Sequence, residues 1–442
     1  MGTKADDKTL LCGVTLWAGC GHKVKREQDV LVAGSRIEAV GENLPRAGAR
    51  IVDGKGDLLL PGFQQMHVHA CQTLFRGEAE DQPLLPWLKK FIWPMEAAHT
   101  AESLRSSTEL TVLELLRSGT TAVFSFETVR HSEVVGQVYR DLGLRATFAP
   151  CLMDESAGVP SLAVSTKDSL AEIEALVEIF SEHERVGVGV APRFALACKE
   201  ESLRETAAFA REKDLPLQTH ANEQLAEIAL VRERTGRGNI EFLIDCGLSG
   251  EGVSLVHGVH LTEGEKAQLR ERGLSLVHCP SANAKLGSGI APVKELLAAG
   301  VPCSLGSDGA ACNNRLDMFA EMRLAAFLQK IARGAEALPV ETILSMATRG
   351  GRSFLPNGSL TGELRPGFQA DMIRVSLSGW HCAPSNSPLT DLVYSAQPED
   401  IRMTMVAGKI LYEDGQYPGI DAERIRATAW QERKQLLQRV ER

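Results

Sequence analysis

Strand-length apolar segments alternate with helix-patterned segments through the middle of the chain. The intervening stretches, such as Ala101–Arg117 and Glu201–Lys213, carry apolar residues at helical spacing. Continuous apolar strands that alternate with amphipathic helices indicate a parallel sheet buried on both faces. Eight such strands in about 250 residues match a (β/α)8 TIM barrel, an α/β fold. The strand segments are Leu58–Phe63, Thr120–Phe126, Arg145–Ala149, Val186–Ala191, Leu215–Thr219, Val253–His257, Leu274–Cys279 and Val301–Gly306.

A different pattern occupies the two ends of the chain. Short β-like pieces such as Val30–Val32 are broken by glycines before residue 60, and the same style returns in Ala370–Leu377 and Met403–Tyr412. We therefore predict that both termini build one small β-sandwich domain, followed by a charged C-terminal helix. The predicted boundaries are 1–60 and 356–420 for the composite β-sandwich domain, 61–355 for the barrel and 421–442 for the helix.

The charge balance and the cysteines limit the class of protein. The formal net charge of −9 argues against a nucleic-acid partner or an anionic membrane surface. No apolar run approaches the roughly 20 residues that span a bilayer. The polar segment Met1–Lys8 lacks a signal-peptide core, and the 10 cysteines contain no Cys-x-x-Cys pair. We expect a cytoplasmic protein that acts on a small molecule, has no nucleic-acid or membrane partner, and forms a homo-oligomer.

A His-Val-His sequence ends the first barrel segment. His67 and His69 are two residues apart, and residues at this spacing in a strand point to the same side. Two imidazoles directed at one point can coordinate the same metal ion. Taken alone the pair is weak evidence, because most His-x-His pairs face solvent or are structural.

Further candidates follow the ends of other predicted strands. They are His220 with Glu223, His257, His278 and Asp308. One histidine at a strand end is more often a packed polar residue than a ligand, but functional groups of a barrel gather at the carboxyl ends of its strands. Three imidazoles and one carboxylate suit a divalent ion, which lowers the pKa of bound water to about 7. Glu223 is placed to move a proton, although a plain helix N-terminal charge is the simpler interpretation.

Four sequence blocks resemble the amidohydrolase superfamily, in the branch that holds S-adenosylhomocysteine/methylthioadenosine deaminases, guanine deaminases and triazine hydrolases. The blocks are Pro61–Ala70, Thr219–Glu223, His278–Val293 and Gly306–Asn314. The resemblance implies that one metal ion is held by His67, His69, His220 and Asp308. It also implies that Glu223 and His257 act with Asp308 in catalysis.

The number of metal ions can be argued from the fourth barrel segment. Relatives with two ions bridge them with a carboxylated lysine at the end of this strand. Here the segment Val186–Ala191 contains no lysine, and Lys199 lies too far along the following loop. We therefore expect one divalent ion, zinc, with iron as the alternative.

Residues in the first long crossover and after two later predicted strands are candidates for substrate binding. Trp87 and Glu96 match positions that stack on the base and accept ribose hydroxyls in adenosine-type deaminases, although a buried Trp and a solvated Glu would look the same. Gln72 and Arg193 instead resemble guanine-binding positions of guanine deaminases, and Gln72 also occurs in triazine hydrolases. Pro150 stands where an arginine serves the homocysteine carboxylate, which favours smaller 5′ groups.

The function predicted from these residues is metal-dependent hydrolytic deamination of an adenine-type purine nucleoside, with release of ammonia. The nucleosides considered are 5′-deoxyadenosine, methylthioadenosine, adenosine and S-adenosylhomocysteine. A guanine or oxopurine deaminase, or an s-triazine amino- or chlorohydrolase, is the alternative. A non-catalytic assembly protein on the same scaffold is disfavoured, because such relatives usually lack the ligands that this chain retains.

Overall fold

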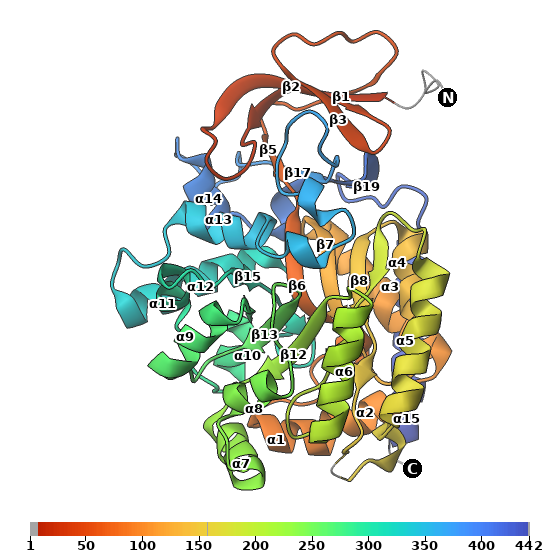
Figure 1. Ribbon diagram of the computed structural model, residues 1–442. Helices are drawn as coiled ribbons and strands as arrows, with labels where there is room; N and C mark the ends of the chain where they lie inside the picture. Colours follow the sequence, from red (N-terminus) through yellow and green to blue (C-terminus); the bar gives the residue numbers. More distant parts are fainter. Residues whose placement is uncertain (1–7, 157, 441–442) are drawn as a thin grey trace.

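A computed structural model describes residues 8–156 and 158–440. Most of the polar N-terminal segment, residues 1–7, and the last two residues of the predicted C-terminal helix lie outside this range. Figure 1 shows a sheet built from the chain ends above a body of strands wrapped by helices. Among the described residues, every helix is too short or too polar to span a bilayer.

The body is a ring of parallel strands. One set runs in the order β10-β8-β7-β6 and a second in the order β12-β13-β14-β15. A parallel bridge from Val190 to Leu217 joins the sets on one side, and β16 pairs with β6 through Asp308 and Val68 on the other. The prediction of a TIM-barrel-type α/β fold is confirmed. The strand bounds are β6 Phe63–His69, β7 Thr120–Phe126, β8 Arg145–Ala149, β10 Val186–Val188, β12 Leu217–Ala221, β13 Val253–His257, β14 Ser275–His278, β15 Cys303–Leu305 and β16 Asp308–Gly309, with a small side pair of β9 Cys151–Leu152 and β11 Ala191–Pro192.

Helices cover the outside of the ring. Helix α3 begins where Thr100 accepts a hydrogen bond from the Ser103 amide, at 3.3 Å, which satisfies a donor that the helix itself leaves free. The outer helices are α3 Ala101–Arg117, α4 Ser132–Leu142, α5 Thr166–Phe180, α6 Glu200–Glu212, α7 Leu225–Thr235, α8 Asn239–Asp245, α9 Glu263–Glu271, α10 Pro280–Lys285, α11 Val293–Ala298, α12 Met318–Arg333, α13 Val340–Thr348 and α14 Pro388–Tyr394. Short helical turns are η2 Ala70–Phe75, η4 Pro160–Leu162, η5 Arg352–Phe354, η6 Gly358–Leu360 and η7 Pro398–Asp400.

Strands from both chain ends share one eight-stranded sheet, in the order β19-β18-β17-β5-β1-β2-β3, with β4 beside β1. The N-terminal and C-terminal parts meet where β5 pairs antiparallel with β17. The strand bounds are β1 Lys8–Leu16, β2 Lys25–Ala33, β3 Arg36–Gly41, β4 Arg50–Asp53, β5 Leu58–Pro61, β17 Met372–Val375, β18 Ile401–Val406 and β19 Lys409–Glu413. The sandwich arrangement and the domain boundaries stay predictions.

The first predicted barrel strand was placed too early in the chain. Leu58–Pro61 belongs to the terminal sheet, and the barrel strand is Phe63–His69. Gly62 separates them, and a Cβ at this position would lie 2.1 Å from Thr121 Cγ2. Both strands are buried along their whole length, so their apolar pattern could not mark the boundary.

One crossover segment forms a cover over one end of the barrel. We call Leu84–Ala97 the lid; it consists of α1 Leu84–Trp87, the π-helical turn η3 Leu88–Ile92 and α2 Trp93–Ala97. The C-terminal helix α15, Ala422–Val440, packs on α3, η2 and α2. Its Leu436 is fully buried in the apolar cluster that contains Trp87 and Trp93. The lid therefore rests against the last helix of the chain (Figure 1).

Candidate active site

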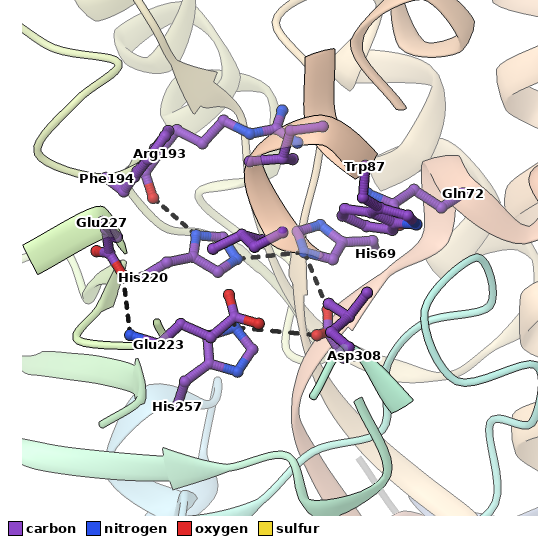
Figure 2. A pocket seen from close by; sticks show the side chains of 13 residues that line it. His69, Gln72, Trp87, Arg193, Phe194, His220, Glu223, Glu227, His257 and Asp308 are labelled. Atoms are coloured by element: carbon purple, nitrogen blue, oxygen red, sulfur yellow. Dashed lines mark hydrogen bonds and ion pairs between the residues drawn. The ribbon is translucent and has the colours of Figure 1, made fainter. Parts of the chain in front are cut away.

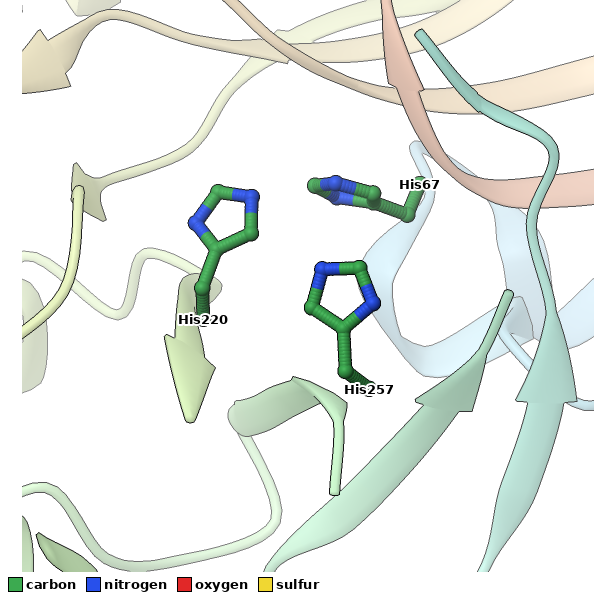
Figure 3. A group of neighbouring side chains, drawn as sticks. All are labelled: His67, His220 and His257. Atoms are coloured by element: carbon green, nitrogen blue, oxygen red, sulfur yellow. The ribbon is translucent and has the colours of Figure 1, made fainter. Parts of the chain in front are cut away.

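Histidines from three barrel strands converge on Asp308 (Figure 2). His67 Nε2 and His69 Nε2 lie 3.3 and 3.2 Å from Asp308 Oδ1. His220 Nε2 lies 3.4 Å from His69 Nε2. Figure 3 shows the ring of His67 facing His220 and His257 across the same space. The carboxyl ends of these parallel strands open on one end of the barrel, which is why residues distant in sequence meet here.

Each of the predicted histidine ligands is held from behind by an oxygen. His67 Nδ1 lies 2.6 Å from Gln218 Oε1. His69 Nδ1 lies 2.8 Å from the Phe126 carbonyl, and His220 Nδ1 lies 2.7 Å from the Arg193 carbonyl. A carbonyl oxygen only accepts, so the ring proton sits on Nδ1 and the Nε2 lone pair points into the shared space, toward Asp308 in His67 and His69.

The Gln218 side chain is itself fixed by two further contacts. Its Nε2 donates to the Met66 carbonyl at 2.9 Å and to Ser254 Oγ at 3.1 Å. This leaves Oε1 as the atom that accepts from His67. The sequence analysis did not name Gln218, although it stands two residues before His220 on the same face of the strand.

The protonation states fit neutral rings around a carboxylate. Burial lowers the pKa of His67 to about 4 and that of His220 well below its usual value. At neutral pH the rings of His67 and His220 are therefore uncharged.

This arrangement fits a divalent cation. His67 Nε2 is buried and has no hydrogen-bond partner among the described residues. A neutral Nε2 and a carboxylate oxygen at 3.2–3.3 Å are two acceptors facing each other, which is unfavourable unless a cation lies between them. Donor atoms of His67, His69 and Asp308 lie within 4.8 Å of one another, as do those of His67, His220 and His257. Imidazole and carboxylate donors suit zinc or another transition ion.

Glu223 lies beside this centre with its carboxyl group buried. Its Oε1 accepts from Ser288 Oγ at 3.0 Å, and its Oε2 lies 3.5 Å from His257 Nε2. Burial raises the pKa of Glu223 above its usual value. A carboxyl group that holds its proton more strongly than usual is suited to act as a general acid near neutral pH.

His257 and Asp308 occupy uncommon backbone conformations. Their φ angles are +75° and +62°, in the left-handed region that residues other than glycine rarely adopt. His257 is held by Asn283 Oδ1, 2.8 Å from its Nδ1, and its Nε2 lies 3.9 Å from Asp308 Oδ2. Strain of this kind collects at functional sites, where it fixes side chains in place.

His278 does not join the group at the barrel end. Its ring is fully buried, both nitrogens lack a partner among the described residues, and burial lowers its pKa to about 3. The next residue, Cys279, lies with its thiol within 4.8 Å of the His257 and Asp308 donor atoms. Successive strand residues point to opposite faces, so only one of this pair can face the centre.

A pocket opens above the centre, under the lid. Its lower wall is polar, with Glu223, Glu227 and Arg193 among the lining residues. Its upper wall is largely apolar. The apolar lining residues are Leu84, Trp87, Leu88, Phe194 and Leu286. The shape suits a flat polar ring system covered by an apolar roof.

Gln72 and Arg193 line this cavity, whereas Glu96 lies behind them. Arg193 Nη1 and Nη2 donate to Glu96 at 2.5 and 3.1 Å, and Gln72 Nε2 donates to Glu96 Oε1 at 3.0 Å. Gln72 Oε1 is buried without a partner among the described residues. Burial disfavours the charge on Glu96, but Arg193 overcomes this and lowers its pKa. The predicted role of Glu96 toward a sugar stays a prediction.

Comparisons with known proteins agree with the site. The profile of the Amidohydrolase family matches residues 58–411. A 5-methylthioadenosine/S-adenosylhomocysteine deaminase of Halobacterium salinarum is 36% identical over 417 residues, 93% of this chain and 94% of that protein. A 5′-deoxyadenosine deaminase of Methanosarcina mazei is 36% identical over 422 residues, covering 93% and 94%.

Solved structures show the same fold. An adenosine deaminase from Xanthomonas campestris with bound zinc superposes with a TM-score of 0.89 at 32% identity, over 97% of this chain and 99% of that one. A triazine hydrolase variant reaches a TM-score of 0.90 at 23% identity, over 97% and 99%, a likeness that concerns the fold alone. The family resemblance seen in the sequence is confirmed, and the chain belongs to the amidohydrolase family.

Proposed function

We propose that this protein is a metal-dependent hydrolytic deaminase that acts on adenine-type purine nucleosides. The substrates considered are 5′-deoxyadenosine, methylthioadenosine, adenosine and S-adenosylhomocysteine. The observation that carries the proposal is a buried set of facing acceptors beside a buried carboxylic acid, in a pocket that Leu84, Trp87 and Leu88 of the lid cover. The names of the relatives, deaminases of these nucleosides at 36% identity, support it.

In this proposal one divalent ion is held by His67, His69, His220 and Asp308. Zinc is the ion we expect, with iron as the alternative, and the zinc of the adenosine deaminase structure supports that choice. Such an ion lowers the pKa of a coordinated water to about 7, which makes a nucleophile available at neutral pH.

The reaction consumes water and releases ammonia from C6 of the purine. Asp308 accepts a proton from the attacking water. Glu223 delivers a proton to ring nitrogen N1, so that electrons of the ring are withdrawn toward N1 and C6 becomes open to attack. Asp308 then passes the proton taken from water to the C6 amino group, the C6–N bond breaks and ammonia leaves. The C6 hydroxyl returns a proton to Glu223 as the C6 carbonyl forms. His257, held at its Nδ1 by Asn283, orients the water. These roles assign Glu223, His257 and Asp308 as the catalytic residues.

Trp87 covers the base, and Gln72, Glu96 and Arg193 contact the rest of the nucleoside. Glu96 Oε1 already accepts from Gln72 and Arg193, whereas Oε2 accepts only from Arg193 and keeps an acceptor site for a sugar hydroxyl. Such an acceptor favours substrates that bring hydroxyl donors and disfavours free bases. The lid therefore sets specificity for nucleosides in this proposal.

A guanine or oxopurine deaminase is the second candidate, on one specific observation. Gln72 Oε1, which has no partner among the described residues, and the Arg193 guanidinium line the same cavity. Together they offer an acceptor and a donor, which complement the N–H and C=O groups of an oxopurine. An s-triazine amino- or chlorohydrolase remains the third, supported only by the fold.

The deciding experiment measures ammonia release by zinc-loaded protein from a panel of substrates. The panel contains the four nucleosides, free adenine, guanine and an amino-triazine. We expect a nucleoside to give the highest kcat/KM, and Glu96→Gln to reduce nucleoside turnover far more than turnover of free adenine. Faster turnover of guanine than of every nucleoside, with a ratio unaffected by Glu96→Gln, would make Gln72 and Arg193 an oxopurine site. Elemental analysis showing two ions per chain would contradict the proposed ligand set.

The assembly and the location of the protein are also part of the proposal. We propose a homo-oligomer in the cytoplasm that acts on a small purine-like molecule. Size measurement in solution by light scattering tests the first statement, and a purely monomeric protein at micromolar concentration would refute it.

A further inference from the structure

The first lid helix begins with a donor that the helix cannot satisfy. Leu84 opens α1, and the first amides of a helix have no partner within it. The preceding Pro83 supplies no side-chain cap. Instead Gln224, from the loop after β12, accepts the Leu84 amide on its Oε1 at 3.3 Å. The start of the lid is thereby tied to the residue that follows Glu223.

The other end of the Gln224 amide leads to the Glu223 carboxyl group. Gln224 Nε2 donates to the Leu286 carbonyl at 3.0 Å and to Ser288 Oγ at 3.3 Å. Ser288 Oγ in turn donates to Glu223 Oε1 at 3.0 Å. Because Ser288 accepts from Gln224, its single proton is free to point at Glu223. A continuous line of hydrogen bonds runs from the lid to Glu223.

The backbone of Glu223 is fixed independently of this line. Its amide donates to Glu227 Oε2 at 2.8 Å, and Glu227 Oε1 accepts from Asn239 Nδ2 at 2.8 Å. Both carboxyl groups are almost fully buried. With the main chain held, the remaining freedom of Glu223 lies in its side-chain torsions, and the bond from Ser288 restrains the position of the carboxyl group. Its Oε2 is then the oxygen that faces His257 and the cavity.

We propose that Gln224 and Ser288 are positioning residues that couple closure of the lid to the orientation of the Glu223 carboxyl group. When the lid lifts, Gln224 loses Leu84 and its amide is no longer held against Ser288. Ser288 then has no fixed direction, and Glu223 can turn away from N1. The acid is presented correctly only when Trp87, one turn after Leu84, covers the base. The inference rests on the proposed role of Glu223 as the proton donor.

The kinetic test uses variants that cut the line at different points. Ser288→Ala removes the bond to Glu223, and we expect kcat to fall about tenfold with little change in KM. Gln224→Ala cuts both arms, so kcat falls and KM rises. Gln224→Glu keeps the acceptor for Leu84 but loses the donor to Ser288, so kcat falls as in Gln224→Ala while KM stays near the wild-type value.

The double variant shows whether the two residues act as one line. We expect Gln224→Ala with Ser288→Ala to lower kcat no further than the stronger single variant, because a broken line cannot be broken twice. Effects on kcat that multiply would overturn the coupling. Ser281→Ala, on neighbouring α10, is the matched control and should keep wild-type kinetics.

A second measurement needs no turnover. Coupling is reciprocal, so breaking the Ser288 end must also loosen the lid. In zinc-loaded protein without substrate, we expect faster hydrogen exchange of the Leu84–Ala97 amides in Gln224→Ala and in Ser288→Ala, but not in Ser281→Ala. Unchanged lid exchange in Ser288→Ala would overturn the inference. Lid exchange that rises as expected in a protein inactive on the whole panel would instead locate the failure in the proposed function.

Discussion

At the scale of single residues, each imidazole of the proposed metal site is held by an oxygen on the far side of its ring. The oxygens come from Gln218 and from the carbonyls of Phe126 and Arg193. These contacts fix which ring nitrogen carries the proton before any ion arrives, so the entropy of orienting the rings is lost during folding and not on binding.

Removal of one proposed ligand should therefore reduce both the bound metal and the reaction rate. We expect His220→Ala to lose most of its zinc after dialysis against a weak chelator, and to lose activity in parallel, because no other described side chain occupies its position. Elemental analysis and ammonia release measure the two effects. The exposed His22→Ala is the control. Full zinc content in His220→Ala would remove this residue from the ligand set.

The catalytic effect of Glu223 should be separable from metal binding. We expect Glu223→Gln to bind zinc as the wild type does but to lower kcat about 10²–10⁴-fold, the usual contribution of a general acid. The amide keeps the size and the contact with Ser288 but cannot release a proton. Glu241→Gln, an exposed residue of α8, is the matched control. A rate within a few-fold of wild type would mean that N1 receives its proton by another route.

The residues with distinctive chemistry could be predicted from the sequence, and their partners could not. Because side chains in a strand alternate with a period of two residues, a His-x-His pair at a strand end is expected to place both imidazoles on one face. The Phe126 and Arg193 carbonyls carry no side-chain signature at all. Arg193 and Glu96 were each assigned to the substrate, yet they bind each other across 97 positions of sequence. Local patterns hold no information on such a distant pairing.

At the scale of elements, patterns of period and punctuation placed most helices but missed one strand boundary. The predicted helix Ala101–Arg117 agrees with α3 to the residue. The segment Leu58–Phe63 failed because two buried strands of different sheets follow each other with only Gly62 between them. A strand that is buried on both faces shows no alternation of apolar and polar residues. Its sequence therefore does not distinguish a strand of the terminal sheet from a barrel strand.

One helix carries a buried acid that should make stability depend on pH. Burial raises the pKa of Glu321, on α12, from 4.5 to about 7. The folded state then holds a proton that the unfolded state has released. The stability contributed by the neutral carboxyl is fully present below about 4.5 and is lost as the pH rises through about 7.

We therefore expect Glu321→Gln to flatten the pH dependence of the free energy of unfolding between pH 4.5 and about 7. The change should be at most about 3.5 kcal/mol, from about 1.4 kcal/mol per unit of pKa. Urea unfolding at several pH values measures it, with the exposed Glu341→Gln of α13 as control. Parallel curves for Glu321→Gln and the wild type would show that this carboxyl group does not titrate in the folded protein.

At the scale of the whole molecule, the lid depends on a helix from the other end of the chain. Leu436 of α15 is buried in the cluster of Trp87 and Trp93, and Arg439 Nε donates to the Ala98 carbonyl at 2.8 Å, just after α2. The lid is thus supported on its outer side by residues that are distant in the sequence. Arg439 and Ala98, for example, are 341 positions apart.

Weakening this support should change substrate binding in the cavity. We expect Leu436→Ala to lower the free energy of unfolding by about 2–5 kcal/mol, as for other buried leucines. KM should rise more than kcat falls, because the chemistry is left in place while the cover loosens. Denaturant unfolding and steady-state kinetics measure these effects. The exposed Gln435→Ala is the control, and an unchanged KM in Leu436→Ala would show that the lid holds its position without α15.

The packing of α15 also determines which end of the protein is better attached to a solid support. The described chain ends at Val440, one residue past the Arg439 contact with the lid, whereas Lys8 opens β1 in the sheet at the opposite end of the molecule (Figure 1). An affinity tag or a fused reporter joined after residue 442 would press on the segment that admits substrate. The same addition at the N-terminal side leaves that entrance clear, so immobilised enzyme for assays is better attached through the terminal sheet.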